Sequence, residues 1–134
     1  MAVATITTLL GNQGDPVEYT VLATTAIAKG TLMQLSSSPQ TATAAGADGE
    51  FFCGIAASEK TTTDGVDKMA CITHCIAQIT AGVGTTTFGV PQKISAANAV
   101  VDADDDNVEK CAEVVGIALE DIADGEQGAV LVNC

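Results

Sequence analysis

One acidic segment, DADDDNVEKCAE at residues 102–113, has the residue types and the spacing of a calcium-binding loop. Four carboxylates fall on the first, third, fifth and twelfth positions, which supply oxygen ligands in such loops: Asp102, Asp104, Asp106 and Glu113. However, Glu109 occupies a position that is normally apolar, and the flanking segments read as strands instead of paired helices. We therefore expect a solvated acidic loop, and keep a calcium-binding surface or adhesion module as the alternative function.

A second segment, CITHC at residues 71–75, places two cysteines beside the single histidine of the chain. On one strand, Cys71 and Cys75 would point to one face and His74 to the other. This geometry suits neither a zinc site nor a hydrogen-bonded nucleophile and base. We expect the cysteines to pack as apolar residues and His74 to face solvent. A small redox or metal enzyme using these three residues is a third, competing hypothesis.

Other catalytic signatures are missing from the sequence. It contains no Gly-Lys-Ser/Thr phosphate loop and no Gly-x-Ser-x-Gly nucleophile elbow. The sequence therefore predicts a protein that is not an enzyme and holds no cofactor.

The composition favours strands over helices. Hydrophobic residues make up 47% of the 134 residues, but there are only three Phe, one Tyr and no Trp. Thr, Val, Ile and Gly are frequent, a balance that is typical of short strands and turns. We expect one all-β (mainly β) domain with little helix. One stretch resists this prediction, because NVEKCAEVV at 107–115 has apolar residues at helical spacing, so we expect at most a short helix before strand resumes by Val115.

The charge excludes several classes of partner. The formal net charge is −12, and all five basic residues are Lys. Without Arg and without a positive surface, binding to nucleic acid or to an acidic membrane is not expected. No segment approaches the roughly 20 apolar residues of a membrane span, and the start of the chain lacks the basic region of a signal peptide. We expect synthesis in the cytoplasm, with reduced cysteines.

Two stretches repeat the same phrase. Residues 52–75 and 114–134 both read Gly-Ile-Ala, then an acidic connection with Asp-Gly, then an apolar run that ends in Cys. With GTLMQLS matching GVPQKIS upstream, we interpret 30–75 and 89–134 as a degenerate internal duplication within residues 19–134. The Asp-Gly pairs predict hairpin turns. The predicted strands are 30–35 and 89–94, 51–57 and 114–119, and 69–80 and 128–133.

Residues 1–18 lie outside the duplication. The apolar, β-prone ATITTLL is followed by the breaker GNQGDP. This pattern predicts either an N-terminal arm that packs on another chain or the first strand of the domain.

Three phrases carry a resemblance to a known family: AIAKGTLMQLSS, FFCGIAAS and ACITHCIAQITAGVG, with GIALEDIADGEQGAVLVNC similar to the closing strands. They resemble the capsid decoration (head-stabilising, or cement) proteins of tailed bacteriophages and related viruses. The resemblance covers roughly residues 26–84.

The resemblance implies a compact β-barrel or β-tulip-like domain with an N-terminal arm. It implies a virion protein made in the host cytoplasm, which binds the major capsid protein on the outer surface of the assembled capsid, commonly as a homotrimer. The arm at residues 1–14 would bind the capsid through seven residues: Ala4, Thr5, Ile6, Thr7, Thr8, Leu9 and Leu10.

Overall fold

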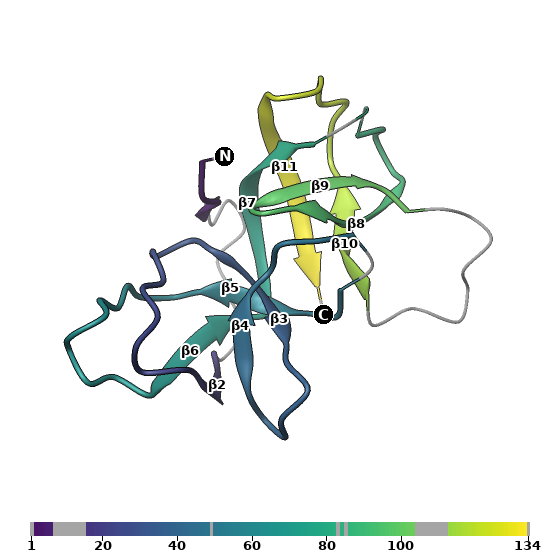
Figure 1. The fold of residues 1–134 in the computed structure, drawn as a ribbon. Helices are drawn as coiled ribbons and strands as arrows, with labels where there is room; N and C mark the ends of the chain where they lie inside the picture. The colour runs from purple at the N-terminus through teal and green to yellow at the C-terminus, as the bar shows by residue number, and fades with distance from the viewer. Residues whose placement is uncertain are drawn as a thin grey trace.

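The computed structural model of the chain describes residues 2–6, 16–48, 50–82, 84, 86–103 and 113–133. Apart from turns and loops, these residues form β-strands arranged in two units that lie side by side (Figure 1). The predicted all-β fold is therefore confirmed. The segment 107–112, for which a short helix was considered, lies outside the described residues, and strand resumes at Val114 as expected.

Eleven strands make up the two units and a short N-terminal segment. The N-terminal segment contains β1 (Thr5–Ile6). The first unit, called the N-terminal sheet here, contains β2 (Val17–Thr20), β3 (Leu32–Leu35), β4 (Ala42–Ala44), β5 (Phe52–Ala56) and β6 (Lys68–Ile72). The second unit, called the C-terminal barrel, contains β7 (His74–Ala81), β8 (Pro91–Ala96), β9 (Ala99–Asp102), β10 (Val114–Ala118) and β11 (Gln127–Asn133).

The C-terminal barrel is closed. Its strands follow the order β7-β11-β10-β8-β9, and β9 returns to β7 through a parallel pairing of Thr80 with Ala99 and of Ala81 with Val100. All other neighbours in the barrel are antiparallel. The ring closes through the last residues of β7, while Ala77 and Gln78 of the same strand pair with β1. The closed ring agrees with the barrel that the resemblance implied.

The N-terminal sheet has the same strand order. It runs β2-β6-β5-β3-β4, and adding five to each strand number gives the order of the barrel. Its two end strands are joined by one parallel bridge, between Thr20 and Thr41, with a hydrogen bond from Thr20 N to Gln40 O of 2.9 Å. The closing contact of the barrel is thus repeated here in a shorter form.

Finer features of the two units also correspond. The isolated bridge between Ile27 and Lys60 matches the one between Thr86 and Ile122. Four turn residues have positive φ in matched pairs, Gly30 with Gly89 and Gly65 with Gly125. The segments 30–75 and 89–134 that match in sequence hold β3–β6 and β8–β11 of these units.

The prediction of a single strand over 69–80 was wrong. The chain leaves β6 at Ile72, and after Thr73 it begins β7 at His74. β6 completes the N-terminal sheet by pairing with β2 and β5, whereas β7 opens the next unit and pairs with β11. A continuous strand cannot serve both closed units. β7 is therefore the counterpart of β2, a strand that the sequence comparison missed together with β4 and β9.

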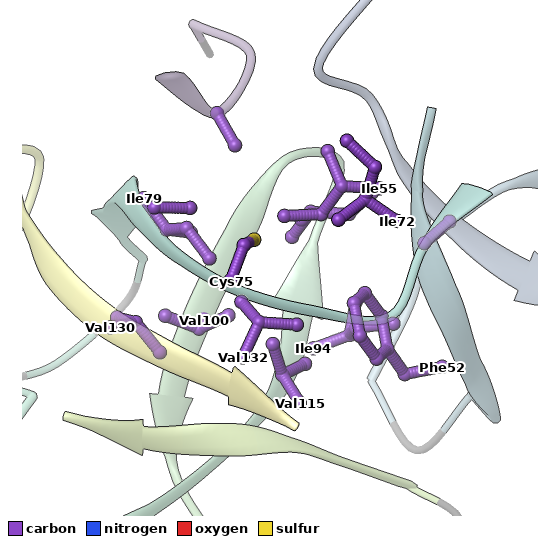
Figure 2. Packing of buried hydrophobic residues seen from close by; sticks show 14 of the residues in the cluster. Phe52, Ile55, Ile72, Cys75, Ile79, Ile94, Val100, Val115, Val130 and Val132 are labelled. Carbon is purple, nitrogen blue, oxygen red and sulfur yellow. The ribbon is translucent and has the colours of Figure 1, made fainter. Parts of the chain in front are cut away.

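The core is divided unequally between the units. One cluster lies inside the N-terminal sheet and includes Met33, Cys53 and Cys71. The larger cluster fills the C-terminal barrel with side chains such as Ile79 and Val130 and continues into the contact between the units (Figure 2). Aliphatic side chains and cysteine dominate both clusters, as the composition predicted.

Candidate interaction surface

The N-terminal segment lies against both units of its own chain. β1 pairs with β7, Thr5 opposite Gln78 and Ile6 opposite Ala77. Just before it, the backbone N–H of Ala4 donates to Gly30 O at 2.8 Å, and Gln127 Nε2 donates to Val3 O at 3.2 Å. Main-chain groups make most of these bonds, so the segment is held with little demand on side-chain identity.

The structure thus places part of the predicted arm. Ala4 is buried just before β1, and Ile6 of β1 packs against the larger core cluster, so this part of the segment lies at the junction of the two units. A surface hollow of about 580 Å³ lies beside them, lined among others by Lys29 and Ala57. The remaining residues of the predicted arm lie outside the described residues: Thr7, Thr8, Leu9 and Leu10.

Of the predicted calcium ligands, Asp102 is held by hydrogen bonds from protein donors. Its Oδ1 accepts from Thr87 N and Gln92 Nε2, both at 2.8 Å, and its Oδ2 accepts from Thr87 Oγ1 at 2.7 Å. Burial raises the pKa of Asp102, but these hydrogen bonds outweigh it and lower the pKa below the ordinary 3.8. Both oxygens of Asp102 therefore already have protein partners.

The other predicted calcium ligands are not brought together with it in the described structure. Asp104 and Asp106 lie outside the described residues, and Glu113 is buried immediately before β10. Within the described ranges, no group of three or more His, Cys, Asp or Glu side chains could hold a metal ion.

The cysteine and histidine residues separate because the strand breaks between them. Cys71 belongs to the core of the N-terminal sheet, where a hydrogen bond with the Cys53 thiol lowers its pKa. Cys75 belongs to the core of the C-terminal barrel, where burial raises the pKa of its thiol to about 11. His74 is exposed, as predicted. The two sulfur atoms therefore do not share a site with the imidazole.

An exposed apolar face covers the outside of the C-terminal barrel. Ile117 of β10 (43% exposed) and Leu119 just after the strand (36%) point outward, because alternate residues of an extended chain share a face. Pro91 of β8 and Leu131 of β11 lie directly opposite Ile117 in the neighbouring strands. We call these four residues, which share one side of the sheet, the barrel face.

A second apolar surface lies at one end of the N-terminal sheet. Val17 begins β2, Leu35 ends β3 and Phe51 precedes β5, and the antiparallel order of the strands directs these three strand ends toward the same end of the unit. Each side chain is more than two-fifths exposed, with Phe51 at 49%. The N–H of Leu35 donates to Phe51 O at 2.9 Å, which fixes these two neighbours. We call these three residues the sheet end.

Neither surface was predicted from the sequence, although one signal was present. The matched phrases GIAA and GIAL differ at their last residue, so that Leu119 replaces Ala57. The larger side chain extends the exposed apolar surface around Ile117, and contiguous surfaces of this kind mark interaction sites.

Compared with models of known protein families and with curated proteins, the sequence has no match. Within the described part of the chain, no helix has the length and apolar character needed to cross a bilayer.

Proposed function

We propose that this chain is a non-enzymatic capsid decoration protein. It binds the outer surface of an assembled viral head as a homotrimer and stabilises contacts between major capsid protein subunits. The sequence resemblance supports this function, and the all-β fold with apolar surfaces on small closed units is consistent with it.

The placement of β1 is the observation that carries the proposal. Its two residues lie on an edge of β7 outside the ring of the barrel, held mainly by backbone hydrogen bonds. A segment that binds by strand addition can exchange a site on its own chain for a similar edge on another chain. The capsid-binding arm would use this exchange, with the free energy of ordering shared among many copies on the shell.

Co-sedimentation with expanded heads that lack the decoration protein tests the proposal. The full chain should bind at a saturating copy number, and a variant lacking residues 1–14 should lose binding. A matched control replaces the same residues with a Gly/Ser segment of equal length, since it keeps the chain length and removes the strand. Full binding by either altered protein, with circular dichroism showing that it is folded, would sink the arm as the capsid-binding element.

The alternative, a calcium-binding module centred on the acidic loop, is separated by calorimetry. Titration of the full chain with calcium should give no saturable heat, because both oxygens of Asp102 are already engaged by Thr87 and Gln92. A stoichiometric, saturable heat that Asp102→Asn abolishes would favour the alternative.

A further inference from the structure

The outer face of the N-terminal sheet is buried inside the molecule. Leu32, Ile55 and Ile72 point outward from β3, β5 and β6, yet they are 0%, 0% and 8% exposed. They belong to the same core cluster as the side chains inside the C-terminal barrel. An outward face of one unit is thus part of the core of the other.

One end of the C-terminal barrel covers this face. At that end, Val115, Val132 and Cys75 lie in the cluster that also holds Phe52, Ile55 and Ile72 (Figure 2). The turn between β8 and β9 reaches the same face.

There, the Asn98 side chain accepts a hydrogen bond from Leu32 N at 3.0 Å. The contact between the units therefore joins the end of one unit to the face of the other, in head-to-tail order.

The two surfaces that meet in this contact have exposed counterparts elsewhere in the molecule. Strand pairing matches Leu32, Ile55 and Ile72 with Pro91, Ile117 and Leu131 of the barrel face. It also matches Ala77 and Ile94, two buried members of the larger cluster, with the exposed Val17 and Leu35 of the sheet end. Each chain thus carries an uncovered copy of the covered face, together with an exposed apolar surface at the sheet end.

We propose that these two surfaces bind each other between copies of this chain, so that the sheet end of one copy covers the barrel face of the next. The intermolecular contact repeats the contact already made within the chain. It is heterologous, so copies add in one direction until a ring closes or a filament grows. N-terminal sheets and C-terminal barrels then alternate in one continuous order.

At Pro91, the backbone of the barrel face has no N–H group that would need a hydrogen-bond acceptor after burial. Leu32 needs an acceptor for its N–H, which Asn98 supplies, whereas its counterpart Pro91 has no N–H that burial would leave unsatisfied. In the N-terminal sheet, Gln40 in the connection after Leu35 occupies the place of Asn98, and both residues have a left-handed backbone, with φ of 51° and 58°. One residue of the turn thus has the same left-handed conformation in both units, although the connection 36–41 after β3 is longer than the connection 97–98 after β8.

Charge sets the conditions for this assembly. Each copy carries a net charge of −12, so copies repel each other at low ionic strength. The proposed contact is apolar, and salt screens the repulsion without weakening the contact. Association should therefore strengthen as salt is raised from about 0.05 M to about 0.5 M, opposite to the behaviour of a contact made by ion pairs.

Sedimentation velocity of the full chain, over a range of concentration and salt, tests the proposal. The wild type should form oligomers, and both Ile117→Glu and Leu35→Glu should raise the dissociation constant by more than about tenfold, because each buries a charge without a partner. Leu22→Glu is the matched control: this residue is 66% exposed and follows the opposite end of β2, so assembly should be unchanged.

Mixing the two variants identifies the geometry. Ile117→Glu keeps an intact sheet end, and Leu35→Glu keeps an intact barrel face, so an equimolar mixture should form a dimer that cannot grow. Circular dichroism checks that each variant is folded. Three results would overturn the proposal: the wild type stays monomeric at high salt, the variants assemble like the wild type, or the mixture stays monomeric. A monomeric wild type would assign the two surfaces to a foreign partner. Since no shell is used, these outcomes are independent of capsid binding.

Discussion

Lys60 in the N-terminal sheet and Ile122 in the C-terminal barrel occupy the same position, each in the isolated bridge of its unit. Both are 3% exposed, yet one carries an ammonium group and the other a hydrocarbon. The Lys60 Nζ donates to the backbone oxygens of Leu22 (3.2 Å), Ala23 (2.9 Å) and Thr25, and to that of Thr61 at 3.3 Å. At this bridge position, the N-terminal sheet has a cation that binds loop carbonyls, whereas the C-terminal barrel has apolar packing.

The reverse exchange occurs nearby. Inside the barrel, Gln92 is fully buried and donates to Asp102, where the N-terminal sheet has Met33 and Ala44. The comparison teaches that one strand order tolerates a buried polar group at different positions. Lys60 donates to loop carbonyls, and the Gln92 amide nitrogen donates to Val90 O and Asp102, while the Gln92 Oε1 has no hydrogen-bond partner in the described structure. The outward faces differ in another way: Ile55 and Ile117 occupy the same position, but a second unit covers only Ile55.

Replacing these two isoleucines should give the largest contrast. Ile55→Ala should lower the free energy of unfolding by about 3 kcal/mol, because it leaves a cavity between the units. Ile117→Ala should cost less than about 1 kcal/mol, because the side chain is already partly in water. Urea unfolding followed by circular dichroism measures both. It should be done at low protein concentration, so that any association does not add to the stability. Equal losses at both positions would contradict the description of Ile55 as a contact between the units.

The two bridge positions should respond differently to the same residue. Lys60→Met removes the donor from four loop carbonyls and should cost about 2–3 kcal/mol. Ile122→Met nearly conserves volume and should cost less than about 1.5 kcal/mol. Thermal unfolding monitors both variants. If Lys60→Met were neutral, the carbonyl oxygens would be satisfied by water, and the ammonium would not organise the loop.

The sequence allowed the repeated part of the fold to be predicted, since the Gly-Ile-Ala strands and the Asp-Gly turns lie where expected. β10 runs from Val114 to Ala118, and Gly125 has the positive φ that its turn requires. These features are local, because a short apolar run or a left-handed turn depends on adjacent residues. The separation of Cys71 from Cys75 could not be predicted in this way, because it depends on which unit each strand closes.

The surfaces could not be predicted for a related reason. Ile55 and Ile117 have identical neighbours in sequence, Gly before and Ala after, but one is buried and the other is exposed. Burial of an outward residue is decided by what packs on the strand, which a pattern within the strand does not contain. Only the difference between Ala57 and Leu119 pointed to an unequal environment.

Substituting two matched glycines tests how much the N-terminal segment contributes to the free energy of unfolding. A Cβ on Gly30 would lie 2.3 Å from Ala4 O, whereas a Cβ on Gly89 would meet nothing within 4 Å. Both have positive φ, so Gly89→Ala should cost about 1 kcal/mol through the backbone alone. Gly30→Ala should cost about 1 kcal/mol more, because the new methyl group also displaces Ala4 and with it the N-terminal segment that contains β1. In a protein lacking residues 1–6 the two costs should become equal; a difference that persists would locate the extra strain elsewhere.

The smallest expected effect concerns Asp102, whose counterpart in the N-terminal sheet is Ala44. At neutral pH, Asp102→Asn should cost about 1 kcal/mol, because it weakens the hydrogen bonds from Thr87 and Gln92. The pKa of Asp102 is lowered on folding, so its contribution is fully present above the unfolded-state value, about 3.9, and is lost as the pH falls through the lower folded-state pKa.

The difference in unfolding free energy between wild type and Asp102→Asn should therefore be constant from pH 7 to about pH 5 and shrink below about pH 4. Thr87→Val supplies the control: it removes one donor to the same carboxylate, so the double variant should cost less than the sum of the single variants. A difference that stays constant down to about pH 2 would mean that the charge of Asp102 does not stabilise the barrel, and that the side chain acts there only through its shape.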